Sequence, residues 1–83
     1  TMATIQELRT QADELKKKED FDNALPLFRQ IWDTEKSDWN GYYFAQCLRK
    51  TNNYSEAREL HSTIKNSYPN FKPILNEELW LDY

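Results

Sequence analysis

The sequence predicts an all-α fold in which two antiparallel helical hairpins stack side by side and a fifth helix caps the stack. Three observations lead to this prediction. Apolar residues recur at steps of three and four along five stretches of the chain, as they do on one face of an amphipathic helix. No stretch shows the period-two alternation of a half-buried strand. A shift of 33 residues superposes the first half of the chain on the second, which indicates duplicated helix–turn–helix units.

The first predicted helix begins at residue 5 and closes on the lysines at 16–18. Thr4 and Glu7 have the spacing of a capping box, which marks a helix start, and lysines are favoured at a helix end. Residues 1–3 precede the cap, and we expect them to be disordered or a cloning remnant. The apolar face of this helix carries Ile5, Leu8, Ala12 and Leu15.

The second helix is predicted over about residues 22–34. Pro26 is expected in its first turn, where the missing N–H of a proline costs little. The apolar face comprises Ala24, Leu27, Phe28 and Ile31, with Leu25 and Trp32 beside it.

The third helix is predicted over residues 39–50, with Ser37 or Asp38 as its cap. Gly41 lies inside it, where glycine costs about 1 kcal/mol relative to alanine unless a neighbouring helix approaches closely. Its apolar residues are Tyr42, Phe44, Ala45, Cys47 and Leu48.

The last two helices are predicted over residues 55–67 and 73–82, separated by the breaker Tyr68-Pro69-Asn70. The fourth helix places Ala57, Leu60, Ile64 and Tyr68 on one face, and the fifth places Ile74, Leu75, Leu79 and Tyr83 on one face.

The internal repeat is the most informative feature of the chain. The aligned apolar pairs are Ala12 with Ala45, Leu15 with Leu48, Phe21 with Tyr54, Ala24 with Ala57, Leu27 with Leu60, and Ile31 with Ile64. The small alanines are expected to let the two helices of each hairpin approach closely, and Phe21 and Tyr54 to fill the space beneath each turn. The pairs Lys16-Lys17 and Arg49-Lys50 also align.

At these positions the sequence resembles the tetratricopeptide repeat family over about residues 5–70. The residues that carry the resemblance are Ala12, Leu15, Phe21, Ala24 and Phe28 in the first unit, and Ala45, Leu48, Tyr54, Ala57, His61 and Pro69 in the second. Lys36 stands where a proline would end the first unit, and Glu19 and Asn52 replace the small turn glycine.

The resemblance implies a right-handed α–α superhelix in one domain over residues 4–83. Repeat one would cover about residues 5–37, repeat two about 38–70, and a terminal helix about 72–82. It also implies a non-catalytic protein–protein interaction module that binds a peptide or partner domain on the concave face of its first helices. The residues predicted to contact that partner are Arg9, Asp13, Lys16, Trp39, Tyr42, Tyr43, Gln46 and Arg49.

Two alternatives for these residues stay open. Trp39 and Tyr42 would have a structural role if they packed against Trp32. A clamp for a C-terminal carboxylate, which the resemblance also suggests, could use Arg9, but the carboxylate of Asp13 would repel such a ligand.

Two other functions are open as well. The repeated basic pairs could contact nucleic acid phosphates, or could simply complement the dipoles of the helix ends. The terminal helix could pair with a second copy of the chain or with further repeats, because Trp80, Leu81 and Tyr83 are apolar and the first two lie off the inward stripe.

The composition argues against catalysis and metal binding. With 83 residues, one Gly, one Cys, one His and a net charge of −3, the chain suits one small domain and lacks the residues for a disulfide, a structural zinc site or a glycine-rich phosphate loop. We find no nucleophile–base pair. We therefore predict no enzymatic activity, no cofactor and no metal.

Single reactive residues are expected to have structural roles. His61 is predicted to be a buried neutral imidazole and Cys47 a buried thiol, and the carboxylates Glu56/Glu59 and Glu77-Glu78 to lie on exposed helix faces. No apolar run approaches the ~20 residues that cross a membrane, and no signal-peptide pattern is present. We expect a cytoplasmic protein that is an N-terminal piece of a longer chain.

Overall fold

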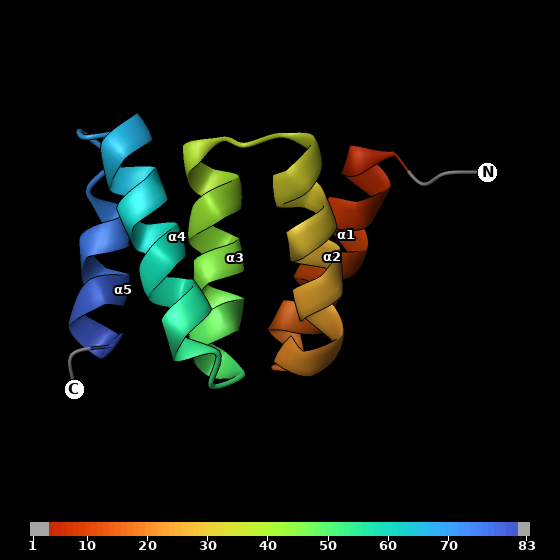
Figure 1. Ribbon diagram of the computed structural model, residues 1–83. Coiled ribbons are helices and arrows are strands. Elements are labelled where there is room, and N and C mark those ends of the chain that lie inside the picture. The colour runs from red at the N-terminus through yellow and green to blue at the C-terminus, as the bar shows by residue number, and fades with distance from the viewer. Residues whose placement is uncertain (1–3, 82–83) are drawn as a thin grey trace.

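The computed structural model describes residues 4–81 and contains no strand within that range. It has five helices: α1 (Ile5–Lys17), α2 (Phe21–Thr34), α3 (Asp38–Lys50), α4 (Tyr54–Ser67) and α5 (Pro73–Leu81) (Figure 1). The prediction of an all-α fold is confirmed. Residues 1–3 and Tyr83, for which the sequence made predictions, lie outside the described residues.

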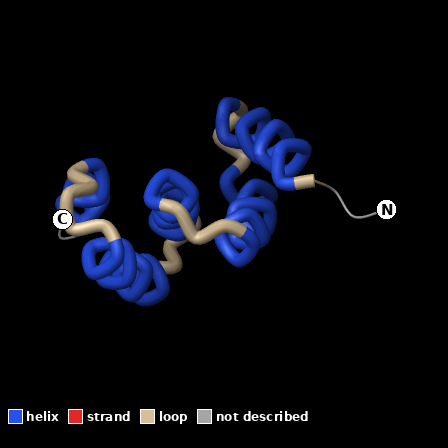
Figure 2. Tube along the Cα trace, turned by 90° about the horizontal axis from the view of Figure 1, so that it is seen from above, coloured by secondary structure: helices blue, strands red, loops and turns tan. Residues whose placement is uncertain are grey.

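The helices form two antiparallel hairpins and a terminal helix, each packed on the next, and α3 also contacts α5. Viewed from above, α1, α3 and α5 lie along one side of the row while α2 and α4 lie along the other (Figure 2). The middle helix of the first set, α3, is set back between its neighbours (Figure 2). The face made by α1, α3 and α5 is therefore concave, and we call it the concave face.

Side-chain caps start the first helix of each hairpin. The hydroxyl oxygen of Thr4 accepts a hydrogen bond from the backbone N–H of Glu7 at 3.2 Å, and that of Ser37 accepts one from the N–H of Asn40 at 3.3 Å. These caps satisfy amide groups that have no partner inside the helix. The start of α1 agrees with the sequence prediction, whereas α3 begins at Asp38, one residue before its predicted start, with Ser37, one of the two predicted candidates, as its cap.

The second helix of each hairpin begins one residue earlier than predicted, at Phe21 and at Tyr54. As a result, Pro26 is the sixth residue of α2 and lies in its second turn, so the prediction of a first-turn proline is wrong. The early start follows from the turn, because the backbone re-enters helical geometry directly after Asp20 and Asn53. Neither of these two residues forms a side-chain cap.

The two hairpins use the same turn. Glu19 and Asn52 have positive φ angles of 59° and 66°, a conformation that glycine usually supplies. The N–H of the residue after each donates back to the carbonyl of Leu15 or Leu48, in both cases at 2.8 Å. The repeat seen in the sequence is thus present in the backbone, without glycine at either turn.

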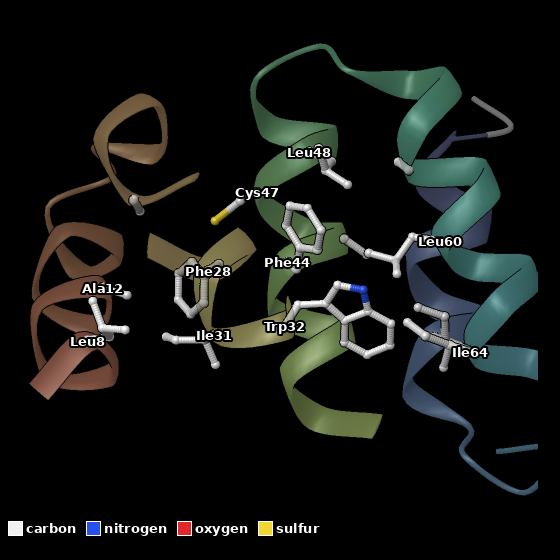
Figure 3. Close-up of a cluster of buried hydrophobic side chains, with 14 residues drawn as sticks. Leu8, Ala12, Phe28, Ile31, Trp32, Phe44, Cys47, Leu48, Leu60 and Ile64 are labelled. Atoms are coloured by element: carbon white, nitrogen blue, oxygen red, sulfur yellow. The ribbon is translucent and has the colours of Figure 1, made fainter. Parts of the chain in front are cut away.

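The four repeated alanines, Ala12, Ala24, Ala45 and Ala57, are fully buried. The large side chains of the core lie between the helices, from Leu8 and Phe28 at the first hairpin to Leu60 and Ile64 at the second (Figure 3). The predicted close approach at the alanines is therefore confirmed. The prediction for Tyr54 is wrong: its ring is 47% exposed, because its hydroxyl group donates to Asn52 in the turn instead of reaching beneath it.

Gly41 is buried where α2, α3 and α4 meet. A Cβ atom at this position would lie 2.6 Å from Cδ1 of Ile64 and 2.9 Å from the ring of Trp32. Real Cβ contacts are never this short, so only glycine fits without a shift in its neighbours. The close approach that would justify a glycine inside a helix is present.

The inward face of α5 differs from the prediction. Ile74 and Glu77 are buried, whereas Leu75 and Leu79 are 46% and 62% exposed. Leu75 and Leu79 were expected inside and Glu77 outside, so both predictions are wrong. The reason is an ion pair, described below, that draws Glu77 toward α3 and turns the two leucines outward.

Candidate functional site

Two hollows lie on the concave face. The first hollow, between α1 and α3, has a volume of about 370 Å3 and is lined by Arg9, Asp13, Phe28, Ile31, Ser37, Asp38, Trp39, Asn40 and Tyr43. The second hollow, between α3 and α5, has a volume of about 460 Å3 and is lined by Tyr42, Gln46, Arg49, Asn76, Glu77, Leu79 and Trp80. Seven of the eight residues predicted to contact a partner line one or the other. The eighth, Lys16, lies 4.0 Å over the ring of Tyr43.

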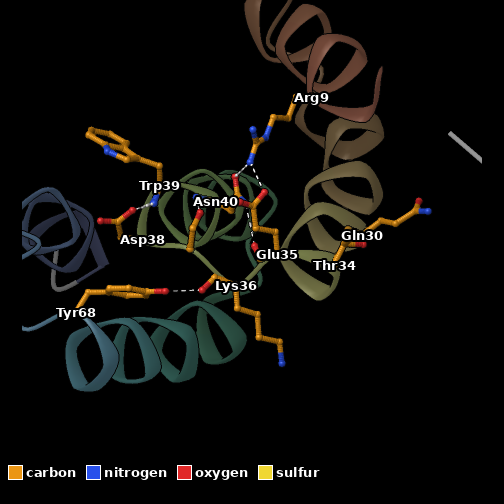
Figure 4. A network of polar contacts seen from close by, with 10 residues as sticks. Arg9, Gln30, Thr34, Glu35, Lys36, Asp38, Trp39, Asn40 and Tyr68 are labelled. Carbon is orange, nitrogen blue, oxygen red and sulfur yellow. Dashed lines mark hydrogen bonds and ion pairs between the residues drawn. The ribbon is translucent and has the colours of Figure 1, made fainter. Parts of the chain in front are cut away.

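Arg9 is tied into the wall of the first hollow. Its guanidinium group donates to the Glu35 carboxylate at 2.8 Å and to the side-chain oxygen of Asn40 at 3.1 Å (Figure 4). Asn40 is 6% exposed and itself donates to the Glu35 carbonyl at 2.8 Å. These bonds hold α1 against the loop between α2 and α3, so the charge of Arg9 is already neutralised within the domain.

An aromatic cluster spans the middle of the concave face. The ring of Trp39 lies 5.6 Å from that of Tyr42, 5.9 Å from Tyr43 and 5.1 Å from Phe71. The contacts with Tyr42 and Phe71 are edge-to-face and the contact with Tyr43 is tilted, and such aromatic pairs hold the rings in place. Trp39 nevertheless remains 49% exposed. Within the described residues, the ring partners of Trp39 and Tyr42 are one another, Tyr43 and Phe71, so the alternative that they pack against Trp32 gains no support from their ring contacts.

A largely buried ion pair forms the floor of the second hollow. Nε of Arg49 lies 2.6 Å from one carboxylate oxygen of Glu77, and its Nη2 lies 3.4 Å from the other. The two side chains are 15% and 3% exposed. The ring of Trp80 covers the guanidinium group, 5.5 Å from its central carbon. Burial and the Glu77 charge raise the pKa of the neighbouring Tyr42 phenol above its ordinary value.

The contribution of α5 to this face was not predicted from the sequence. Leu75, Asn76 and Leu79 were not predicted as contact residues, although Leu75 and Leu79 are exposed and Asn76 and Leu79 line the second hollow. The signal was available: a further shift of 33 residues carries Tyr42 onto Leu75 and Gln46 onto Leu79. The third unit thus places leucines where the second places a tyrosine and a glutamine.

The two described residues proposed for self-association, Trp80 and Leu81, differ in their exposure. Trp80 is 63% exposed, as predicted. Leu81 is half-buried and packs against the core, so its predicted position off the inward stripe is wrong. The register of α5 explains this, because Leu81 follows Ile74 by seven residues and lies on the same face.

The repeated basic pairs do not form a free ribbon of charge. Lys16 lies over Tyr43, and Nζ of Lys50 lies 5.7 Å from the centre of the Phe21 ring. Arg49 is engaged with Glu77. Three of the four cations are thus paired within the domain, two with aromatic rings and one with a carboxylate. The nucleic-acid alternative is therefore without structural support.

Comparison with known families decides the classification. Residues 15–75 match the sequence model of the tetratricopeptide repeat, and the observed hairpins, alanine contacts and turns agree with it. The chain belongs to the tetratricopeptide repeat family. No curated protein and no solved structure matched the chain. Among the described helices of this tetratricopeptide repeat domain, none is long and apolar enough to cross a membrane.

The potentially reactive groups of the repeat domain are buried. Cys47 is fully buried, and burial raises the pKa of its thiol to about 12, which keeps it protonated and unreactive at neutral pH. Within residues 4–81, no group of three or more His, Cys, Asp or Glu side chains could hold a metal ion.

His61 is buried as predicted, with 2% of its surface exposed, and its Nε2 atom has no hydrogen-bond partner. It lines a hollow of about 190 Å3 between α4 and α5 together with Arg58, Ser62, Glu78 and Leu81. Burial lowers the pKa of the imidazole below its ordinary value, and the lysine and arginine charges nearby act in the same direction. The opposing effect of Glu78 and Glu77 is smaller.

We predict that replacing His61 with phenylalanine, the residue found at the equivalent position 28, stabilises the domain. Removing a buried polar atom that has no hydrogen-bond partner is expected to raise the free energy of unfolding by about 1 kcal/mol at neutral pH. The folded-state pKa of His61 is lowered, so the neutral imidazole contributes its full share of the wild-type stability above the ordinary histidine pKa. This contribution is lost as the pH falls from there through the folded-state pKa. Urea unfolding of both proteins between neutral and mildly acidic pH would show a gap that widens as the pH falls. A gap that stays constant or narrows would contradict this prediction.

Proposed function

We propose that this tetratricopeptide repeat domain is a non-catalytic interaction module that binds a peptide segment of a partner protein along its concave face. One observation carries the proposal: large apolar side chains remain exposed on this face although a compact core is available. Trp39, Leu79 and Trp80 are 49%, 62% and 63% exposed. Exposed apolar groups that gather on one face of a small domain are typical of interaction sites.

The geometry of the face supports a peptide ligand. The two hollows lie on either side of α3, and the aromatic cluster of Trp39, Tyr42 and Tyr43 lies between them. An extended chain laid across α1, α3 and α5 could place side chains in both hollows. Tryptophan and tyrosine supply a large contact area and a polar group at small cost in side-chain entropy, which is why such residues dominate binding energies.

The proposal is tested by selecting a peptide display library on the immobilised domain and measuring the enriched peptides by fluorescence anisotropy. Replacing Trp39 with alanine is expected to weaken binding by about 30-fold, the effect of losing one central aromatic anchor. Tyr54→Ala is the matched control, because this aromatic residue is almost equally exposed, at 47%, but is the first residue of α4 and lines neither hollow.

Circular dichroism and thermal unfolding must show that both variants fold. An equal loss of affinity in Tyr54→Ala, or no loss in Trp39→Ala, would contradict the proposal, and so would the absence of any enriched peptide. The exposed Trp80 also keeps the self-association alternative open. Sedimentation of the free domain over a range of concentrations tests it: a monomer throughout would exclude pairing through α5.

A further inference from the structure

We infer that the peptide bound on the concave face is basic and amphipathic: a lysine or arginine side chain lies in the first hollow, and a large apolar side chain lies in the second. This inference rests on the proposed function. It assigns a ligand chemistry to each hollow from the charges and surfaces that line it.

The described side chains that line the first hollow carry a net negative charge. Its one cationic side chain, Arg9, is already paired with Glu35 at 2.8 Å. Asp13 and Asp38 line the same hollow, and neither carboxylate forms an ion pair with another described residue. From the described residues, the Asp38 carboxylate accepts one hydrogen bond, from the N–H of the next residue, Trp39, at 2.7 Å.

The aromatic lining of the first hollow favours a cation as well. The rings of Trp39 and Tyr43 lie 5.9 Å apart and are tilted by 31° to each other, and Trp39 is half exposed. Because Lys16 already lies over the Tyr43 ring at 4.0 Å, the ring surface offered to a ligand is that of Trp39. A lysine ammonium or arginine guanidinium group would meet this ring and a carboxylate in the same place, and both attract it. An acidic peptide or a nucleic acid phosphate would meet the carboxylates of Asp13 and Asp38 and be repelled.

The second hollow has the opposite character. Among the described residues that line it, the charged ones are Arg49 and Glu77, and they neutralise each other at 2.6 Å. Its remaining surface comes from Tyr42, Leu79 and Trp80, with the carboxamides of Gln46 and Asn76 beside them. A neutral site of about 460 Å3 with apolar walls suits a large apolar side chain. The two carboxamides, one on α3 and one on α5, can bond to the backbone of an extended peptide.

The inference is tested on the peptides enriched by the display library. We expect lysine or arginine together with leucine, phenylalanine or tryptophan in the enriched sequences. The double variant Asp13→Asn/Asp38→Asn, which keeps the size of both side chains, is expected to weaken binding by about fivefold to tenfold, the effect of losing two exposed charge pairs. Replacing the peptide's basic residue with glutamine should cause a similar loss, and combining the two changes should cause little further loss.

Asp33→Asn is the matched control, because Asp33 is an exposed carboxylate that lines a hollow of α2 and α4 away from the concave face. Leu79→Ala should weaken the binding of peptides that place a large apolar residue in the second hollow. It should not affect the binding of peptides that carry alanine at that position. Enriched peptides without basic residues, or equal binding by wild type and the double Asp variant, would overturn the inference and leave the proposed function standing. If no peptide binds, or if a single-stranded oligonucleotide binds more tightly than any peptide, both fail.

Discussion

Replacing Glu77 with alanine is expected to release α5 from the rest of the domain and to lower the free energy of unfolding by about 3 kcal/mol. Removing one partner of a buried ion pair leaves the other charge without compensation, which commonly costs about 3–5 kcal/mol. We take the lower end because Arg49 keeps 15% of its side chain exposed and can move toward water. Urea unfolding measures the loss. Amide hydrogen exchange should show α5 opening first, since the lost ion pair joins it to α3.

The double variant Arg49→Met/Glu77→Leu distinguishes a lost ion pair from a lost side-chain contact. Replacing both charges with apolar groups of similar size is often neutral or stabilising, so this variant should regain most of the stability that Glu77→Ala loses. If Glu77→Ala unfolds at the same urea concentration as the wild type, the ion pair does not hold α5. If the double variant is as unstable as the single one, the buried charge is not the cause.

Replacing Gly41 with valine is expected to destabilise the domain by about 3 kcal/mol, the upper range for an overpacked core. The added Cβ alone would lie 2.6 Å from Cδ1 of Ile64 and 2.9 Å from Trp32. These neighbours belong to α4 and α2, so the helices on both sides of α3 would have to move. Gly41→Ala should lower the free energy of unfolding by less than Gly41→Val does, because alanine gains about 1 kcal/mol over glycine in helix propensity. Thermal unfolding followed by circular dichroism measures both changes.

A second substitution, Ile64→Val, tests whether crowding against Ile64 is the reason that Gly41→Ala destabilises the domain. Valine lacks the Cδ1 atom that comes closest to the added Cβ, so Gly41→Ala should be less damaging in the Ile64→Val background than in the wild type. We expect a favourable coupling of about 1 kcal/mol, within the range for residues in contact. Strictly additive effects would mean that crowding at Ile64 is not what requires a glycine here.

Much of the fold was predictable because it depends on residues close together in the sequence. The caps at Thr4 and Ser37 act on amides three residues away, and each turn closes over five residues. The alanine pairs were recognisable because the same spacing occurs twice. The errors at Phe21 and Tyr54 are shifts of one residue at helix starts, where an extended turn residue and a first helical residue have similar sequence preferences.

The candidate site was predictable in part. The residues on α1 and α3 that were predicted to contact a partner line the two hollows of one face, with the exception of Lys16. Helical spacing made this predictable, because it determines which side chains lie outside the buried face of a helix. Their pairings could not be predicted. Arg9 and Arg49 were expected to meet a partner protein, but they bind Glu35 and Glu77, which lie 26 and 28 residues further along the chain. A long cationic side chain can reach several carboxylates, and only the packing of helices selects one.

The sequence by itself determined the number of helices, the two hairpins and the residues that bring them together, because these follow from local spacing repeated at an interval of 33 residues. Only the tertiary structure decided which side of α5 faces inward. Both faces of this short helix carry apolar residues, so periodicity does not distinguish them. The burial of Ile74 and the ion pair of Glu77 with Arg49 fix its orientation, and in doing so they place Leu79 and Trp80 on the concave face.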